Sequence, residues 1–370
     1  MKEIKSIINA YSTIDFSTTK AALATVARVE GSSYRRTGAR MLVLDNGTWL
    51  GGISGGCLEG DALRRARHAI VRDRPSVITY DTTQEDGHEI GAALGCNGII
   101  DVLFTPLDPG DAQNPVRLLS TLTDTRVPRV LVSITGGDEA PAALGKTLLF
   151  ETGEQFLATF AVPAMAASVL VDIQPCLDHH RSRTIVYPTG EGTSLKVFIE
   201  VIAPVTQLIV YGGNYDIYPL LRMAGELGWN STLVVNINKA PKSMVSLASR
   251  LLHNKGEEQP ITDDYTAVLL MSHDYKTDFA NLQTAIKTPA PYIGILGPRK
   301  RSGKMFDALA EEGRPLPEPD RQRIFSPMGL DIGASTPEEI ALSILAEIRS
   351  FFAGRQGMPL REREGTIYGD

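Results

Sequence analysis

The first hundred residues alternate between short apolar runs and glycine-rich or polar turns. Apolar runs of this length, rich in Val, Ile and Leu, are typical of β-strands. The predicted strands cover residues 22–29, 40–44, 49–53, 75–80 and 99–104. Asp45-Asn46-Gly47 is a hairpin signal between the second and the third of them. Residues 59–71 place apolar side chains on one helical face, so the pattern indicates a mixed α/β unit.

The strand pattern begins again after an interval of about 107 residues. Val130–Thr135 resembles Leu23–Val26, and Lys196–Glu200 resembles Asp101–Thr105. A duplicated unit and a chance similarity between hairpins both explain this recurrence. If the unit is duplicated, the second copy lacks one glycine-rich segment of the first, because Ala158–Pro163 stands in its place.

A different pattern begins near Gln207, where a strand, a loop, a helix and a second strand follow one another. The predicted strands are 208–211, 231–235, 267–271 and 292–296. The first helix is expected over 217–227. A closing helix begins at Thr336, where Glu339 completes a capping box. Strands that alternate with helices indicate a doubly wound parallel sheet of the Rossmann type.

The expected fold class is therefore α/β. It combines an N-terminal mixed unit, with a degenerate repeat if the duplication is real, and a C-terminal Rossmann-like parallel sheet. A chain of 370 residues is long enough for two or three domains with full cores. The expected boundaries are 1–107 for the first unit, 108–204 for its β-rich continuation, 205–353 for the Rossmann-like domain and 354–370 for a tail.

Composition and charge argue against several classes of protein. The net charge of −6 is unlike that of a general nucleic-acid binder. The sequence has no apolar run of the roughly 18 residues that span a bilayer, and its start has no secretory h-region. Its three cysteines do not make a disulfide framework. We therefore expect a cytoplasmic protein with free thiols and with neither a nucleic acid nor a membrane as partner.

The run 51–60 surrounds Cys57 with five glycines. Glycine lets the backbone approach a ligand closely, and successive N–H groups can form an anion-binding concavity. The Ser54 hydroxyl and the amides of Gly55 and Gly56 are the candidate cradle for an anionic group. The Cys57 thiol is a candidate metal ligand or sulfur carrier, because thiolates are soft and nucleophilic. A tight turn beside an inert, buried cysteine is the alternative.

Cys96 lies in a second glycine-rich loop, 39 residues after Cys57. Without a CxxC pair, this spacing does not match a structural zinc site, so a metal held wholly by protein residues is not expected. A thiol that meets a metal or a sulfur atom carried by a ligand fits the pattern better. Arg35, Arg36 and Arg40 lie on the adjoining loop and strand and are expected to contribute positive charge.

The turn after the first strand of the second domain departs from a dinucleotide fingerprint. That fingerprint needs G-x-G-x-x-G and, about 20 positions later, an acidic residue that holds the ribose hydroxyls. Here Gly212 and Gly213 are followed by Asn214, and the next strand ends near Asn236 and Asn238. An NAD(P) site is therefore not expected, although a nucleotide-shaped crevice is.

Three loops are expected to converge at the carboxyl ends of these parallel strands. They are 212–216, 272–274 and 297–301. His273 is either a polar site residue or a cap of its loop. The basic cluster 299–304, which begins with Arg299, is either a phosphate site, since Arg binds phosphate in bidentate fashion, or a solvated loop.

Several of these segments resemble the XdhC/CoxI family. The matching N-terminal motifs are Gly31-Ser32-Ser33, Gly38–Met41, Ile53–Gly60 and Leu94–Gly98. The matching C-terminal motifs are Met271–Asp274, Gly294–Arg299 and Gly329–Ala341, which resemble the family's Rossmann-like domain. The resemblance covers about residues 15–107 and 205–352. Members of the family are accessory factors for xanthine dehydrogenase and related molybdenum hydroxylases.

The resemblance implies that the protein binds the molybdenum cofactor transiently, protects it during sulfuration and inserts it into a xanthine dehydrogenase-like hydroxylase. It implies no net chemistry by the protein itself, and it suggests a homodimer and a cysteine desulfurase as a second partner. Cys57 is the family's candidate for the thiol that contacts the cofactor and its metal. The other candidate cofactor-binding residues, from the glycine-rich loops and the expected crevice, are Ser54, Gly55, Gly56, Glu59, Arg40, Cys96, Gly212, Gly213, His273 and Arg299.

The chain departs from the family's pattern in the second domain. Gly212-Gly213-Asn214-Tyr215 replaces Gly-Ala-Gly-His, and Asn236 and Asn238 replace acidic residues after the second strand. Two other functions remain open. One is an oxidoreductase that uses a nicotinamide cofactor in the C-terminal domain, and the other is a persulfide sulfur carrier that uses Cys57.

Overall fold

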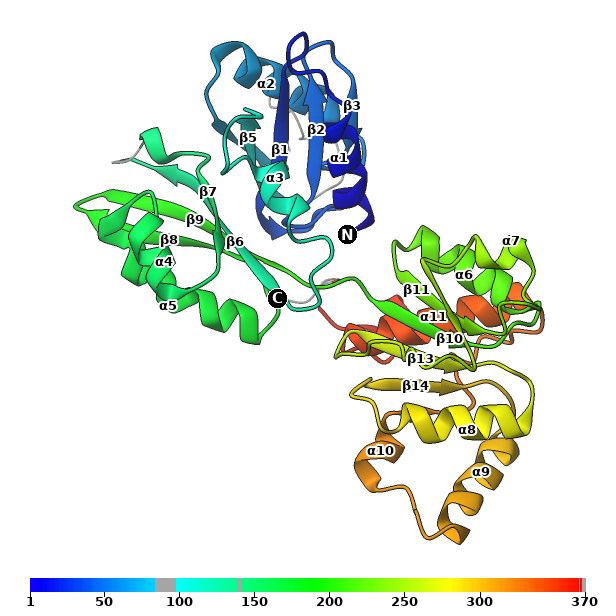
Figure 1. Cartoon of the computed structure of the whole chain (residues 1–370). Coiled ribbons are helices and arrows are strands. Elements are labelled where there is room, and N and C mark those ends of the chain that lie inside the picture. Colours follow the sequence, from blue (N-terminus) through cyan, green and yellow to red (C-terminus); the bar gives the residue numbers. More distant parts are fainter. Residues whose placement is uncertain (84–97, 139–140, 366, 368–370) are drawn as a thin grey trace. The chain divides into compact units, whose positions relative to one another are not determined.

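The computed structural model of the chain divides into two compact units, Met1–Pro204 and Val205–Asp370 (Figure 1). It describes residues 1–83, 98–138, 141–365 and 367. The first unit contains two antiparallel sheets, and the second contains one parallel sheet. Within these described ranges, no helix is both long and apolar enough to cross a membrane.

The first sheet of the N-terminal unit has the strand order β3-β2-β1-β5-β4, with every neighbouring pair antiparallel. Its strands are β1 (Ala21–Gly31), β2 (Arg40–Leu44), β3 (Trp49–Gly51), β4 (Ser76–Asp81) and β5 (Gly98–Pro106). Side chains of a strand alternate between its two faces. Ala22 and Ala24 accordingly pack against helix α2 (Glu59–Arg72), whereas Leu23 packs on the other face with Ile7 of helix α1 (Lys2–Ser12).

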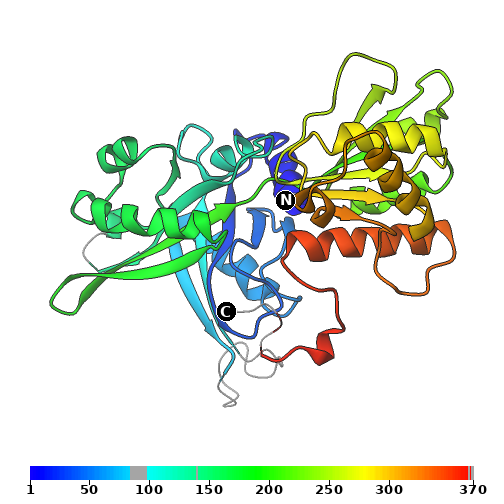
Figure 2. The same cartoon turned by 90° about the horizontal axis from the view of Figure 1, so that it is seen from below.

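The second sheet of this unit has the strand order β7-β6-β9-β8. Its strands are β6 (Arg129–Gly137), β7 (Thr147–Phe150), β8 (Arg183–Gly190) and β9 (Thr193–Ile202). The other elements of this part of the chain are helices α3 (Pro115–Ser120), α4 (Gly153–Thr159) and α5 (Pro163–Asp178), with the 3-10 turn η1 (Pro141–Ala143). Phe156 of α4 and Val169 of α5 are buried against β6 and β9, and Figures 1 and 2 show both helices beside this sheet.

The two sheets share local details. The N–H of Gly38 donates to the carbonyl of Val26 at 2.8 Å, and the N–H of Gly145 donates to the carbonyl of Ile134 at 2.9 Å. The pairing of β1 with β5 shifts register after Val26, and the pairing of β6 with β9 shifts after Ile134. A duplicated unit, one of the two explanations left open by the sequence, would show this arrangement. The segment that follows β7 forms α4 and α5 and carries no glycine-rich loop.

The second unit is a parallel sheet with the order β12-β11-β10-β13-β14-β15. Counted from β10, this is the order 3-2-1-4-5-6 of a doubly wound Rossmann sheet, so the predicted fold class is confirmed. The strands are β10 (Gln207–Tyr211), β11 (Asn230–Val235), β12 (Arg250–His253), β13 (Thr266–Leu270), β14 (Tyr292–Ile295) and β15 (Ile324–Phe325).

Helices cover both faces of this parallel sheet. Helices α6 (Ile217–Glu226), α7 (Lys242–Val245) and α11 (Pro337–Phe352) lie on one face, and α8 (Tyr275–Ala285) and α9 (Arg299–Glu311) lie on the other. Figure 2 shows α11, in orange-red, opposite α8, in yellow. Two short helices, α10 (Glu318–Gln322) and the 3-10 turn η2 (Leu360–Glu362), complete the unit.

Some local predictions need correction. The strand expected over 49–53 ends at Gly51. The basic cluster expected as a loop is the first turn of α9. The short edge strands β12 and β15 were not predicted, because two to four residues show no readable periodicity and form strands only by pairing with β11 and β14. The capping box is confirmed, because Glu339 N–H donates to Thr336 Oγ1 at 3.3 Å and Thr336 N–H donates to Glu339 Oε2 at 2.9 Å.

Candidate functional site

The glycine-rich loop leaves β3 through a turn that only glycine fits. Gly51 has φ +84°, and a Cβ at this position would lie 2.3 Å from the carbonyl oxygen of Arg40. The N–H of Gly52 donates to the same carbonyl at 2.9 Å. Positive φ costs glycine little, whereas any other side chain would both strain the backbone and clash. The local sequence therefore fixes where the loop starts.

Ser54 and Glu59 hold the loop together. The Ser54 N–H and hydroxyl both donate to the Glu59 carboxylate, at 2.8 and 2.5 Å. The Ser54 hydroxyl oxygen in turn accepts from the N–H groups of Gly56 and Leu58, at 3.1 and 3.0 Å. Burial opposes ionisation of Glu59, but hydrogen bonds from Ser54 and from the backbone of Ile53 and Glu59 together outweigh it and keep the pKa of Glu59 below its ordinary value. These two side chains are thus engaged inside the loop.

The loop presents a free thiol immediately before helix α2. The Cys57 side chain is partly exposed, packs against the core beneath α2, and has its Sγ 3.4 Å from Ser54 Oγ. Among the described residues, the backbone N–H groups of Gly55 and Cys57 have no hydrogen-bond acceptor within the protein. Over the same described ranges, no three His, Cys, Asp or Glu side chains gather as a metal site. The thiol and two amides are what this loop offers to a ligand.

The arginines predicted to add charge near this loop already have partners. The guanidinium of Arg40 is buried, forms an ion pair with Glu200 of β9 and donates to the carbonyl of Gly38 at 2.7 Å. Arg35 forms an ion pair with Glu3 of α1. Sequence reasoning missed Glu200 because it lies 160 residues from Arg40 in a different sheet. Cys96 falls outside the described residues.

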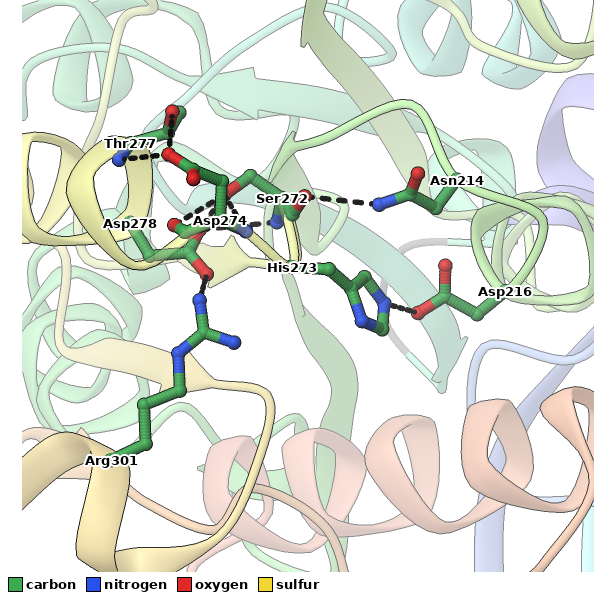
Figure 3. A network of polar contacts seen from close by, with 8 residues as sticks. All are labelled: Asn214, Asp216, Ser272, His273, Asp274, Thr277, Asp278 and Arg301. Carbon is green, nitrogen blue, oxygen red and sulfur yellow. Dashed lines mark hydrogen bonds and ion pairs between the residues drawn. The ribbon is translucent and has the colours of Figure 1, made fainter.

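In the second unit, the structure brings the three predicted loops together at the carboxyl ends of the strands (Figure 3). The side-chain amide of Asn214 donates to the carbonyl of Ser272 at 3.0 Å. Ser272 Oγ donates to the buried carboxylate of Asp278 at 2.5 Å, and Arg301 of α9 donates to the same carboxylate at 2.6 Å. Arg301 is therefore committed to an internal ion pair, and Asp278 is a network member that sequence reasoning did not single out.

His273 lies beside this network and is held by a carboxylate. Its Nε2 lies 2.8 Å from Asp216 Oδ2, and Figure 3 shows the imidazole pointing toward Asp216. His273 has φ +59°, a conformation that non-glycine residues rarely adopt and that often marks a functional position. Its side chain is 52% exposed, whereas that of Asp216 is 12% exposed. The pair can therefore orient a solvent-accessible imidazole, which no single stretch of sequence could have indicated.

A cavity of about 330 Å³ adjoins His273. It is lined by His273, Tyr275, Pro298, Lys300, Arg301 and Lys304. Arg299, the other predicted cluster residue, is the exposed first residue of α9 and does not line this cavity. Gly212 and Gly213 lie in the turn after β10 and line a different, larger cavity of the same unit.

Comparison with known proteins identifies the family of this chain. A sequence model of the XdhC and CoxI family matches residues 17–81, and a model of the XdhC Rossmann domain matches residues 208–348. The chain belongs to the XdhC/CoxI family. The two matches fall in the two units of the structure, one over the sheet that carries the Cys57 loop and one over the parallel sheet.

Relatives within this family carry informative names. A Bacillus subtilis protein, named as a subunit of a probable xanthine dehydrogenase, is 29% identical over 89% of this chain and 92% of its own length. The Escherichia coli molybdenum cofactor insertion chaperone PaoD is 23% identical over 89% of this chain and 83% of its own. A crystal structure described as a xanthine dehydrogenase from Bacillus halodurans shares the fold, with a TM-score of 0.70, 24% identity and 98% of each chain covered.

Proposed function

We propose that this member of the XdhC/CoxI family is an accessory factor that binds the molybdenum cofactor and assists its insertion into a xanthine dehydrogenase-type hydroxylase. The observation that carries the proposal is the partly exposed Cys57 thiol, presented by a preorganised glycine loop beside two backbone amides that find no acceptor among the described residues. The relative named as a molybdenum cofactor insertion chaperone supports the same function.

The residues of the loop fit the two ends of such a cargo. A pterin phosphate is an anion, and the amides of Gly55 and Cys57 can donate to it, whereas those of Ser54 and Gly56 are already bonded. The sequence suggested the Ser54 hydroxyl and the amides of Gly55 and Gly56 as the anion cradle, whereas we now propose the amides of Gly55 and Cys57. The soft sulfur of Cys57 suits the molybdenum end of the cofactor. Ser54 and Glu59 then act by holding the loop in shape.

The finer parts of the proposal rest on the family resemblance. We propose that the cofactor is protected on this protein while it is sulfurated, with a cysteine desulfurase as the second partner. We also propose that the protein works in the cytoplasm as a homodimer. The client is a hydroxylase of the xanthine dehydrogenase class, in keeping with the name of the Bacillus subtilis relative.

The test is a pterin measurement on the protein purified from cells that make the cofactor. After oxidation, the fluorescent pterin derivative should be present in the unchanged protein and strongly reduced in Cys57→Ala. Cys176→Ala is the matched control, because Cys176 is a free cysteine buried in α5. Absence of pterin from the unchanged protein, or equal pterin in Cys57→Ala, would refute the proposed role of Cys57.

The same thiol favours one second candidate function. A partly exposed free cysteine such as Cys57 can also carry a transferable persulfide sulfur. Cyanide releases such sulfur as thiocyanate and leaves the thiol. Thiocyanate from the unchanged protein without any bound pterin would favour the carrier, whereas pterin without cyanide-labile sulfur would favour the chaperone.

A further inference from the structure

A cavity of about 550 Å³ opens at the carboxyl ends of strands β10 and β11. Small-molecule sites commonly measure about 300–1,000 Å³, and ligands of open α/β sheets bind at this edge. The cavity is lined by residues of four segments: Tyr211–Asn214, Val234–Asn236 with Lys239 and Ala240, Asn254 with Lys255, and residues of the β13–α8 region including Ser272, Lys276 and Asn281.

Lysines from three different segments line this cavity. Two of them, Lys239 and Lys255, lie in turns that hydrogen bonds from their backbone N–H groups hold in shape. The N–H of Lys239 donates to the carbonyl of Asn236 at 2.9 Å, which closes the turn after β11. The N–H of Lys255 donates to His253 Nδ1 at 3.0 Å, at the end of β12. Because β11 and β12 pair in parallel, these turns leave neighbouring strands at the same edge. Lys276 reaches the cavity from the first turn of α8.

The positive charge at this edge is only partly compensated, since the Asp274 carboxylate attracts Lys276. Within the part of the chain that the structure describes, no Asp or Glu lines the cavity and the three ammonium groups form no ion pair with a carboxylate. Asn236 uses its side-chain oxygen to accept from the N–H of Asn238 at 3.1 Å, so its NH2 group is what remains to donate. The edge therefore offers cations and donors, which suit an acceptor-rich anion.

This lining changes the interpretation of the missing carboxylate. In Rossmann domains an acidic residue after the second strand holds an unmodified ribose, whereas a nearby cation accommodates a ribose phosphate. Here Asn236 stands at the strand end and Lys239 follows it, which matches the second case. The sequence alone argued against NAD; the tertiary arrangement favours a phosphorylated ribose.

The glycine turn is less suited to a diphosphate. Asp216 stands at the N-cap of α6, where its carboxylate makes no cap hydrogen bond and pairs with His273. Its negative charge disfavours an anionic ligand at this helix N-terminus. A Cβ at Gly213 would lie 2.8 Å from Val235 Cγ2, so this glycine serves close packing against β11. The phosphate contacts are therefore expected at the lysines and not at the glycine turn.

We propose that this cavity binds a nucleotide through a phosphate monoester on its ribose, held by Lys239, Lys255 and Lys276. The site lies in the second unit and is independent of the proposed cofactor loop around Cys57. Two sources share this chemistry, namely the adenosine 2′-phosphate end of NADP(H) and a free mononucleotide. Lys276 can approach such a phosphate from α8 while the other two lysines approach from the strand ends.

The test is equilibrium binding to the full chain by calorimetry at low ionic strength. The probes are adenosine 2′,5′-bisphosphate, 5′-AMP, adenosine, NADP⁺ and NAD⁺. We expect at least one phosphomonoester to bind at least about tenfold more tightly than adenosine, with an affinity that falls as salt rises. If adenosine 2′,5′-bisphosphate binds more tightly than 5′-AMP and NADP⁺ more tightly than NAD⁺, the ligand is the adenosine 2′-phosphate end of NADP(H). If 5′-AMP binds as tightly as the bisphosphate, the ligand is a mononucleotide.

Lysine variants tie the binding to this cavity. Lys239→Gln and Lys255→Gln should each weaken the phosphomonoester several-fold and leave adenosine unchanged. Lys300→Gln is the matched control, because Lys300 is an exposed lysine of α9 that does not line this cavity. Tight binding of adenosine alone, no binding of any probe, or an equal loss in Lys300→Gln would overturn the proposal. If Lys239→Gln retains its bound pterin, the lysine cavity is distinct from the cofactor site proposed at Cys57.

Discussion

Arg40 and Glu200 form a buried ion pair that joins the two sheets of the first unit. Their side chains are 3% and 8% exposed, and the guanidinium also donates to the carbonyl of Gly38. Gly38 has room only for hydrogen here, because a Cβ would lie 2.6 Å from Glu200 Oε1. Glu200→Gln keeps the shape of the side chain and removes its charge, so Arg40 is left as a buried cation without a counterion.

Removing one member of a buried pair costs about 3–5 kcal/mol, because the remaining charge stays desolvated. We expect a loss of this size from the free energy of unfolding of the first unit in Glu200→Gln. Replacing both partners by apolar residues, as in Arg40→Met with Glu200→Leu, should recover most of it, since the desolvation cost disappears together with the pair.

Urea unfolding followed by tryptophan fluorescence measures this loss. Trp49 lies in the first unit and Trp229 in the second, so a Trp229→Phe background leaves Trp49 as the reporter of the first unit. Glu30→Gln is the control, because Glu30 is exposed and Arg28 keeps Asp101 as a partner, so the loss should be less than about 1 kcal/mol. A loss below about 1 kcal/mol in Glu200→Gln would refute the reasoning.

Two further predictions concern single positions. Gly51→Ala should lower the free energy of unfolding by about 2 kcal/mol or more and also lower the amount of bound pterin, because its Cβ would meet the Arg40 carbonyl. Urea unfolding and the pterin measurement check this prediction, and an unchanged urea midpoint contradicts it. Hydrogen bonds from Ser335 and Thr336 lower the pKa of Glu339 to about 2, so its stabilising contribution is present above pH about 4.5 and is lost as the pH falls toward 2. Urea unfolding at pH 6 should therefore show a larger free energy of unfolding for the unchanged protein than for Glu339→Gln. This difference should decrease as the pH is lowered, and a difference that stays constant contradicts the prediction.

The sequence was sufficient where a local pattern decides the structure. The capping box at Thr336 is one example, because its two hydrogen bonds join residues only three positions apart. The parallel sheet is another, because strands buried on both faces are continuously apolar and alternate with amphipathic helices. Each family motif, including the one around Cys57, also lies within one short segment, and the family assignment followed from these motifs together.

The partners of the predicted site residues depended on tertiary packing. Arg40 meets Glu200 across 160 positions of the chain, and this pairing uses a charge that the sequence suggested was available to a ligand. His273 meets Asp216 across 57 positions. The sequence places each member correctly in a strand or a loop, but it does not say which side chains face one another.

What the sequence by itself determined is the fold class of each unit, the family, and the glycine loop that carries Cys57, since each of these depends on local periodicity or on a contiguous motif. Only the tertiary structure decided that Arg40, beside that loop, pairs with Glu200 and that His273 pairs with Asp216. It also decided that lysines from the ends of two neighbouring strands and from α8 share one cavity. The physical reason is that hydrogen bonding, ion pairing and burial act between groups that are close in space, and the folding of the sheets brings together residues that are distant in the chain.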